Sequence, residues 1–107
     1  SGLAMCGKIT FCYSMSTFLI FRAYEFIRND IAYENLPVRL VGCAGPYPDY
    51  GISHNCENEE DVNLIKTLPN FSVYAFDNCC EEEHQYLKAV LKEDYSKPYP
   101  IYFRLTR

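Results

Sequence analysis

The chain has 107 residues, of which 49% are hydrophobic and 22% charged, so we expect residues 1–107 to form one globular domain with a core. The net charge of −4, without a cluster of lysine or arginine, argues against a nucleic-acid partner. No apolar run approaches the length of a membrane span and no signal peptide is recognisable, so we expect a cytoplasmic protein with no membrane partner.

Strand-like and helix-like segments alternate along the chain. Residues 8–13 are rich in β-branched and aromatic side chains and predict a strand, and a helix is predicted over 16–33 with Ser14 or Ser16 as its N-cap. Pro37 ends that helix, and a loop rich in glycine and proline occupies residues 43–58. The other predicted elements are strands over 38–42, 71–75 and 101–105 and helices over 59–68 and 80–93.

The element order β-α-β-α-β-α-β predicts an α/β fold. Strands separated by helices of this length indicate a three-layer αβα domain with a mainly parallel sheet and right-handed crossovers. Ligands of such sheets bind beyond the carboxyl ends of the strands. Those ends lead into Ser14–Thr17, the long loop, Phe76–Asn78 and the C-terminal Thr106–Arg107.

The segment Thr17–Tyr24 opens the first predicted helix with aromatic residues at intervals of three. At about 100° per residue, Phe18 projects onto the polar face that Arg22 and Glu25 mark, and Phe21 lies at its margin. Aromatic rings outside the core stripe suggest a stacking platform for a flat ligand ring. A helix covered on both sides within a larger assembly is the alternative from spacing alone.

The cysteines do not form a recognisable framework. Cys79 and Cys80 are adjacent, Cys12 lies inside a predicted strand, and none of the six forms a C-x-x-C pair. This pattern argues against a disulfide scaffold and against a zinc site, so we expect no metal site in the chain and reduced, buried thiols.

Several ordered motifs together resemble the central, pyrimidine-binding domain of transketolase-type thiamine-diphosphate enzymes, most closely the C-terminal subunits of split bacterial transketolases. The resemblance extends over nearly the whole chain. It is carried by Gly2-Leu3-Ala4-x-x-Gly7-Lys8, Thr17-Phe18-Leu19, Arg28–Tyr33, Leu36–Gly42, Glu60-Asp61 with the helix to Asn70, and Ile101-Tyr102-x-Arg104-Leu105-x-Arg107.

The resemblance implies a cofactor and residues that contact it. Phe18, Phe21 and Tyr24 match positions that pack around the aminopyrimidine ring of thiamine diphosphate, with Phe21 as the stacking residue. The cofactor then supplies the nucleophile and electron sink for transfer of a ketol unit between sugars, and the protein supplies orientation and electrostatics.

Two further residues match positions that meet the sugar. Gly51-Ile52-Ser53-His54 resembles a G-P-T/S-H motif whose histidine contacts the substrate and takes part in proton transfer. Aligned back from Glu60-Asp61, however, Cys56 falls near that histidine position; we favour His54 because the local motif fits. Arg107 resembles a strand-end arginine that binds the phosphate of phosphorylated sugars.

The resemblance also implies parts that the chain lacks. The family's glutamate, which protonates N1′ of the pyrimidine, lies shortly before the G-L-A segment, and no carboxylate precedes the first predicted strand here. The preceding strand and helix and the pyrophosphate-binding domain, which holds Mg²⁺, are also missing. We therefore expect a partial domain that acts in a dimer or hetero-oligomer with a pyrophosphate-binding partner and is inactive alone.

Other functions are consistent with the same residues. The altered sequence around His54 and Cys56 would suit a non-catalytic assembly or dimerisation module. The cofactor could also serve another reaction, in a synthase or a 2-oxoacid dehydrogenase component. A flavodoxin-like domain fits less well, because Gly42-x-x-Gly45 is followed by proline and no helix is predicted there.

Overall fold

Four parallel strands form the centre of the computed structural model, which describes residues 2–77 and 81–106. They are β1 (Thr10–Met15), β2 (Val38–Cys43), β3 (Ser72–Asp77) and β4 (Ile101–Thr106). Their order in the sheet is β1-β2-β4-β3, and every neighbouring pair is parallel. The predicted α/β class with a parallel sheet is therefore confirmed.

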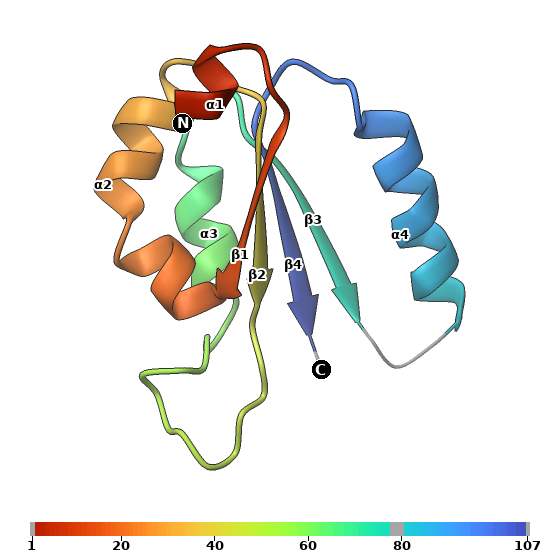
Figure 1. Cartoon of the computed structure of the whole chain (residues 1–107). Helices are drawn as coiled ribbons and strands as arrows, with labels where there is room; N and C mark the ends of the chain where they lie inside the picture. Colours follow the sequence, from red (N-terminus) through yellow and green to blue (C-terminus); the bar gives the residue numbers. More distant parts are fainter. Residues whose placement is uncertain (1, 78–80, 107) are drawn as a thin grey trace.

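Helices cover both faces of this sheet, as a three-layer fold requires. The segments η1 (Thr17–Phe21), α2 (Tyr24–Phe26) and η2 (Ile27–Ala32) lie with α3 (Glu60–Lys66) on one face, and α4 (Glu81–Asp94) lies on the other (Figure 1). A short helix, α1 (Gly2–Met5), precedes β1. None of the helices in the described part of the chain is long and apolar enough to cross a membrane.

The strand β1 begins at Thr10, two residues later than predicted, because α1 continues into a capping turn. Gly7 has a φ of 86°, in the left-handed region that glycine adopts without strain. Its N–H donates to the carbonyl of Ala4 at 3.0 Å, and the N–H of Lys8 donates to that of Leu3 at 3.0 Å. These two bonds close the helix end in the manner of a C-cap, so that pairing of β1 with β2 starts only at Thr10.

Each face of the sheet has its own hydrophobic core. The first core joins Ile20 and Ile27 of the first helical stretch to Ile65 of α3 and Leu40 of β2. The second core, beneath α4, contains Phe76, Val90, Ile101 and Phe103. Successive residues of one strand serve opposite cores, as the period of two in a strand requires.

The helix predicted over residues 16–33 is not regular. Its η1 and η2 parts are π-helical, with i→i+5 hydrogen bonding, and Ala23 between them leaves helical geometry with φ −103° and ψ 11°. A fixed turn of about 100° per residue therefore does not describe this segment. Neither of the two predicted N-cap residues caps this helix: Ser14 lies within β1, and the Ser16 side chain makes no capping hydrogen bond.

An unpredicted buried arginine ties β2 to the end of α4. Arg39 is 1% exposed, and its guanidinium donates to the main-chain carbonyls of Asp94, Tyr95, Lys97 and Tyr99 at 2.7 to 3.2 Å. A cation at a helix C-terminus meets the negative end of the helix dipole. Burial lowers the pKa of Arg39, while the neighbouring Tyr99 and Asp94 act in the opposite direction.

Candidate functional site

The carboxyl ends of the strands meet at one edge of the sheet, where the long loop also lies. β1 runs into η1 there, and β2 runs into the loop over residues 44–59, which extends beyond the arrowheads of the strands (Figure 1). The Ala44 N–H donates to the Leu105 carbonyl at 2.8 Å, and the Cys56 N–H donates to the Ala44 carbonyl at 3.5 Å. The loop is therefore closed at its base, at the edge where parallel sheets bind ligands.

Phe18 and His54, two predicted site residues that are far apart in the sequence, are in contact at this edge. The rings of Phe18 and His54 meet edge to face with centroids 4.9 Å apart, and the ring of Tyr50 also contacts His54, with centroids 4.8 Å apart. The Arg22 guanidinium covers a face of Phe18 at 4.5 Å from its centroid, a favourable cation–π distance. Phe18 therefore forms a wall of the edge that is backed by Arg22 and His54.

The other two predicted aromatic residues differ in their surroundings. Phe21 is 37% exposed, and its ring contacts no other aromatic ring in the described residues. Tyr24 instead packs beside the first core, and its hydroxyl is 2.8 Å from Oγ1 of Thr67, just beyond α3. Phe21 is therefore the exposed ring of the three, whereas Tyr24 joins two helical segments.

The loop that carries His54 is held by one side-chain amide. Asn55 accepts the Tyr47 N–H at 2.6 Å and donates to the carbonyls of Tyr47 at 3.0 Å and Gly51 at 2.7 Å. His54 Nδ1 is 2.8 Å from the Ser53 hydroxyl. Within the described residues Nε2 has no hydrogen-bond partner, so one ring nitrogen is oriented while the other remains available.

A polar cavity of about 210 Å³ lies beneath the loop, beside Arg104. Its lining residues are Ala44, Gly45, Pro46, Asn55, Cys56, Glu57, Arg104 and Thr106. Burial raises the pKa of the Cys56 thiol to about 12, with the charge of Asp61 adding to the shift. Cys56 therefore stays protonated at neutral pH and is not a reactive thiolate.

Four buried or partly buried side chains form a network that the sequence reasoning missed. Tyr102 donates to Oδ2 of Asp61 at 2.5 Å, and Oγ of Ser16 is 2.8 Å from the Tyr102 hydroxyl. Arg104 Nε donates to both carboxylate oxygens of Asp61 at 3.1 Å. Asp61, Tyr102 and Ser16 are fully buried, so these polar groups satisfy one another away from solvent.

One signal in the sequence pointed to this network. Asp61 lies four residues before Ile65 and seven before Leu68, so it occupies the apolar stripe of α3. The charges of Glu60 and Asp61 also suit the positive end of the helix dipole in the first turn of α3. A carboxylate on a buried stripe requires a partner, and the sequence alone did not identify which strand provides it.

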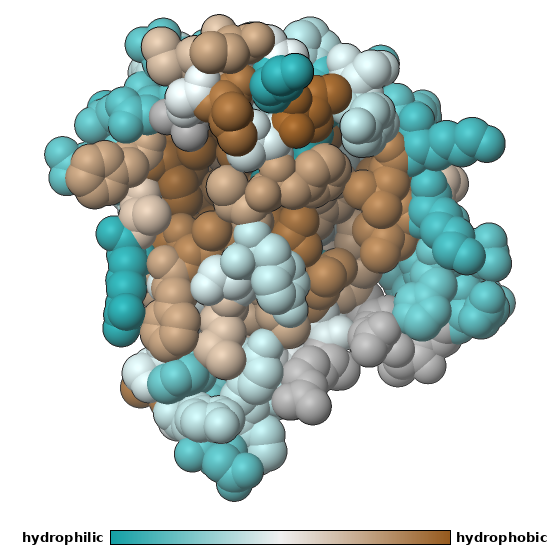
Figure 2. All heavy atoms as spheres, in the orientation of Figure 1, coloured by the Kyte–Doolittle hydropathy of each residue, from teal (hydrophilic) through white to brown (hydrophobic). Residues whose placement is uncertain are grey.

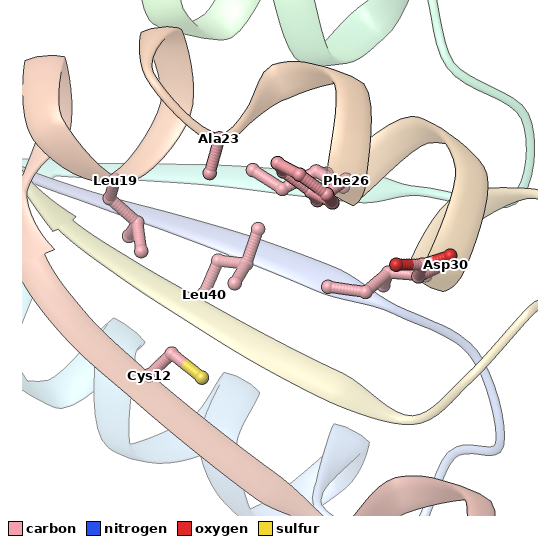
Figure 3. A pocket seen from close by; sticks show the side chains of 8 residues that line it. Cys12, Leu19, Ala23, Phe26, Asp30 and Leu40 are labelled. Carbon is pink, nitrogen blue, oxygen red and sulfur yellow. The ribbon is translucent and has the colours of Figure 1, made fainter. Parts of the chain in front are cut away.

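A second, apolar cavity of about 220 Å³ lies away from the carboxyl edge, between β1 and the first helical stretch. In Figure 3, Leu19, Ala23 and Phe26 reach into it from the helical stretch and Cys12 and Leu40 reach into it from the strands. Figure 2 shows apolar side chains gathered on the same face of the molecule. Phe11 and Tyr13 of the edge strand β1 are 47% and 69% exposed.

Arg107 lies outside the described residues. Within residues 2–77 and 81–106, no group of three or more His, Cys, Asp or Glu side chains is placed to hold a metal ion. The described cysteines are unpaired, but they are not buried as predicted: Cys6 is exposed and Cys12, Cys43 and Cys56 are half-buried.

The fold and the edge define a class of protein: an α/β domain that gathers aromatic residues and a loop histidine at the carboxyl ends of a parallel sheet. No protein-family model matches the chain. It is 36% identical, over 110 aligned residues, to a putative transketolase C-terminal section of Methanocaldococcus jannaschii, covering 100% of this chain and 32% of that protein. It is 29% identical to the 6-deoxy-6-sulfo-D-fructose transketolase subunit SqwH of a Clostridium species, with coverage of 100% and 32%.

A solved structure gives the same result. The chain superimposes on a split-gene transketolase, described as an inactive β4 tetramer, with a TM-score of 0.79 and 33% sequence identity, covering 99% of this chain and 31% of that one. The comparisons confirm the predicted resemblance to transketolase C-terminal subunits. The chain spans about a third of the length of these relatives.

Proposed function

We propose that this chain is part of a thiamine-diphosphate-dependent, transketolase-like enzyme that transfers a ketol unit between sugars. In this proposal the chain supplies the aminopyrimidine-binding half of the site within a longer polypeptide, called here the complete subunit. The observation that carries the proposal is the contact between Phe18 and His54 at the carboxyl edge of the sheet. The ring of Phe21, three residues after Phe18, is exposed. These residues match the family positions for the cofactor ring and the sugar.

The open ring of Phe21 fits a flat heteroaromatic ligand. A stacked ring needs one free aromatic face, and the 37% exposure of Phe21, without an aromatic neighbour among the described residues, supports this role. Phe18 would border the ring, held in place by Arg22 and His54. Tyr24 would support this wall through Thr67. When bound, the cofactor supplies the nucleophile and electron sink.

His54 is the residue that we propose to contact the sugar and to move protons. Its Nδ1 is oriented by Ser53, and Nε2 remains available to donate or accept at a sugar hydroxyl. Cys56, the alternative at this position, is a poor candidate because its buried thiol stays protonated. Arg107 is proposed to bind an anionic group of the sugar, as the resemblance implies.

The rest of the site is proposed to come from other chain segments. A pyrophosphate-binding domain of a partner would hold Mg²⁺ and the diphosphate, and the assembly would be a dimer or a larger oligomer. The open edge of β1, with exposed Phe11 and Tyr13, supports further pairing, because unpaired strand edges are usually covered. We propose that another strand of the complete subunit pairs there.

The test compares two histidine variants in the complete subunit assembled with its partner. His54→Gln should reduce ketol transfer by at least about 100-fold, as expected for the loss of a general acid–base group. Thiamine-diphosphate affinity should stay close to that of the wild type. His84→Gln, on the exposed surface of α4, is the matched control and should remain active. Full activity of His54→Gln would favour a non-catalytic assembly role or another catalytic residue.

A further inference from the structure

The buried network at the carboxyl edge connects elements that carry different halves of the proposed site. Ser16 directly precedes the aromatic segment that begins with Thr17 and Phe18. Arg104 lines the polar cavity beneath the loop that carries His54. Asp61, at the start of α3, is joined to both: to Arg104 directly and to Ser16 through Tyr102.

The direction of the hydrogen bonds in this network follows from donor counting. The single hydroxyl hydrogen of Tyr102 is directed to the Asp61 carboxylate, so Ser16 must donate to the Tyr102 oxygen. Burial raises the pKa of Tyr102, and the hydrogen bond to Asp61 raises it further, so its phenol keeps this hydrogen. Ser16 is thereby fixed from inside the sheet instead of capping its own helix.

The second arm leads from Asp61 to the loop. Its carboxylate binds Nε of Arg104, and within the described residues the terminal nitrogens of Arg104 have no protein partner. The Arg104 side chain is 13% exposed, and it lines the cavity together with Cys56. The position of this cavity wall therefore depends on Asp61.

Packing around the network leaves little room for adjustment. A Cβ atom added to Gly42 would lie 2.5 Å from both Ser16 Oγ and the Tyr102 hydroxyl oxygen. Contacts this short require the neighbours to move, so Gly42 allows Ser16 and Tyr102 to meet across β2. A shift of the Asp61 carboxylate would therefore displace Ser16, through Tyr102, as well as Arg104.

We propose that Asp61 is a positioning residue that sets the geometry of both halves of the site. Through Tyr102 and Ser16 it fixes the start of the cofactor-facing aromatic segment. Through Arg104 it fixes the wall of the polar cavity beneath the loop that carries His54, which we place on the sugar side of the site. This inference rests on the proposed function. It adds that the arm through Tyr102 and Ser16 controls cofactor affinity, whereas the arm through Arg104 controls sugar affinity.

The experiment breaks each arm separately in the complete subunit assembled with its partner. Tyr102→Phe removes the link to Ser16 and leaves Asp61 paired with Arg104. It should raise the Kd for thiamine diphosphate about tenfold and leave the sugar KM unchanged. Tenfold is the lower end of the loss expected when a hydrogen bond that orients a ligand-contacting residue is removed. Arg104→Gln should raise the sugar KM by about the same factor and leave the cofactor Kd unchanged. Asp61→Asn should raise both constants.

Two further variants distinguish positioning from general stability. Ser16→Ala should reproduce the cofactor defect of Tyr102→Phe, which tests this arm again if the latter variant folds poorly. Arg39→Met should lower the melting temperature while both constants stay at wild-type values, because Arg39 stabilises the other face of the sheet. Equal effects of the two arms on both constants, or no effect of either, would overturn the positioning role. Failure of the wild-type assembly to bind thiamine diphosphate would instead overturn the proposed function itself.

Discussion

Replacing Phe21 by alanine tests the cofactor wall most sharply, because this ring is the open member of the aromatic segment. A phenylalanine buries about 200 Å² when fully covered. Since Phe21 is 37% exposed, a ring stacked on it would cover about 70 Å² more, which corresponds to about 1.8 kcal/mol at about 25 cal/mol per Å². The geometry of an aromatic pair adds about 0.5–1.5 kcal/mol. We therefore expect a loss of about 2–3 kcal/mol, or a rise in Kd of about 30- to 150-fold.

Isothermal titration of the assembled complete subunit with thiamine diphosphate and Mg²⁺ measures this change. Tyr33→Ala is the matched control, since Tyr33 is a 60% exposed aromatic residue just after η2, near the start of β2 rather than at the carboxyl edge. Its Kd should equal that of the wild type. An unchanged Kd for Phe21→Ala, or an equal loss in both variants, would refute the stacking assignment.

Three further predictions concern the surroundings of the site. Gly42→Ala should lower the free energy of unfolding by about 1–3 kcal/mol in urea denaturation, because it overpacks the sheet, and an unchanged midpoint would contradict this. Cys56 in the native subunit should react with iodoacetamide at pH 8 at least about 100-fold more slowly than in urea, as read by peptide mass spectrometry; similar rates would contradict its high pKa. The hydrogen bond to Asp94 raises the pKa of Tyr74 to about 12 from 10, so its stabilising contribution is present below pH 10 and is lost as the pH rises to 12. The melting temperature should therefore fall less steeply over this range in Tyr74→Phe, whereas parallel curves would refute the assignment.

Local patterns in the sequence were sufficient to predict the order and type of the main elements. The predicted strand over 38–42 corresponds to β2, and within the predicted helix over 59–68 the apolar residues Val62, Ile65 and Leu68 are buried. Such patterns report which side of an element faces a core. They also predicted the edge at which the loop and the first helical stretch meet, because parallel strands place their carboxyl ends together.

Partners that depend on strand order could not be predicted in this way. Asp61 meets Tyr102 because β4 lies between β2 and β3, an order that no local periodicity specifies. The partners of Arg39 could not be predicted for the same reason. A charge within an apolar strand does not indicate that four main-chain carbonyls, of Asp94 at the end of α4 and of residues just after it, accept its hydrogen bonds. Tyr24 was grouped with Phe18 and Phe21 by spacing, but the π-helical η1 and the break at Ala23 place Tyr24 on another face of the helical stretch.

The most direct test of the central claim is a reconstitution assay for ketol transfer from a ketose donor to an aldose acceptor. Activity would be measured for the 107-residue chain alone, for the complete subunit alone, and for the complete subunit with its pyrophosphate-binding partner, each with thiamine diphosphate and Mg²⁺. We predict turnover only for the assembled pair, with loss of activity on removal of the cofactor. Turnover by the 107-residue chain alone, or an assembled pair that binds the cofactor but transfers no ketol unit, would contradict the account.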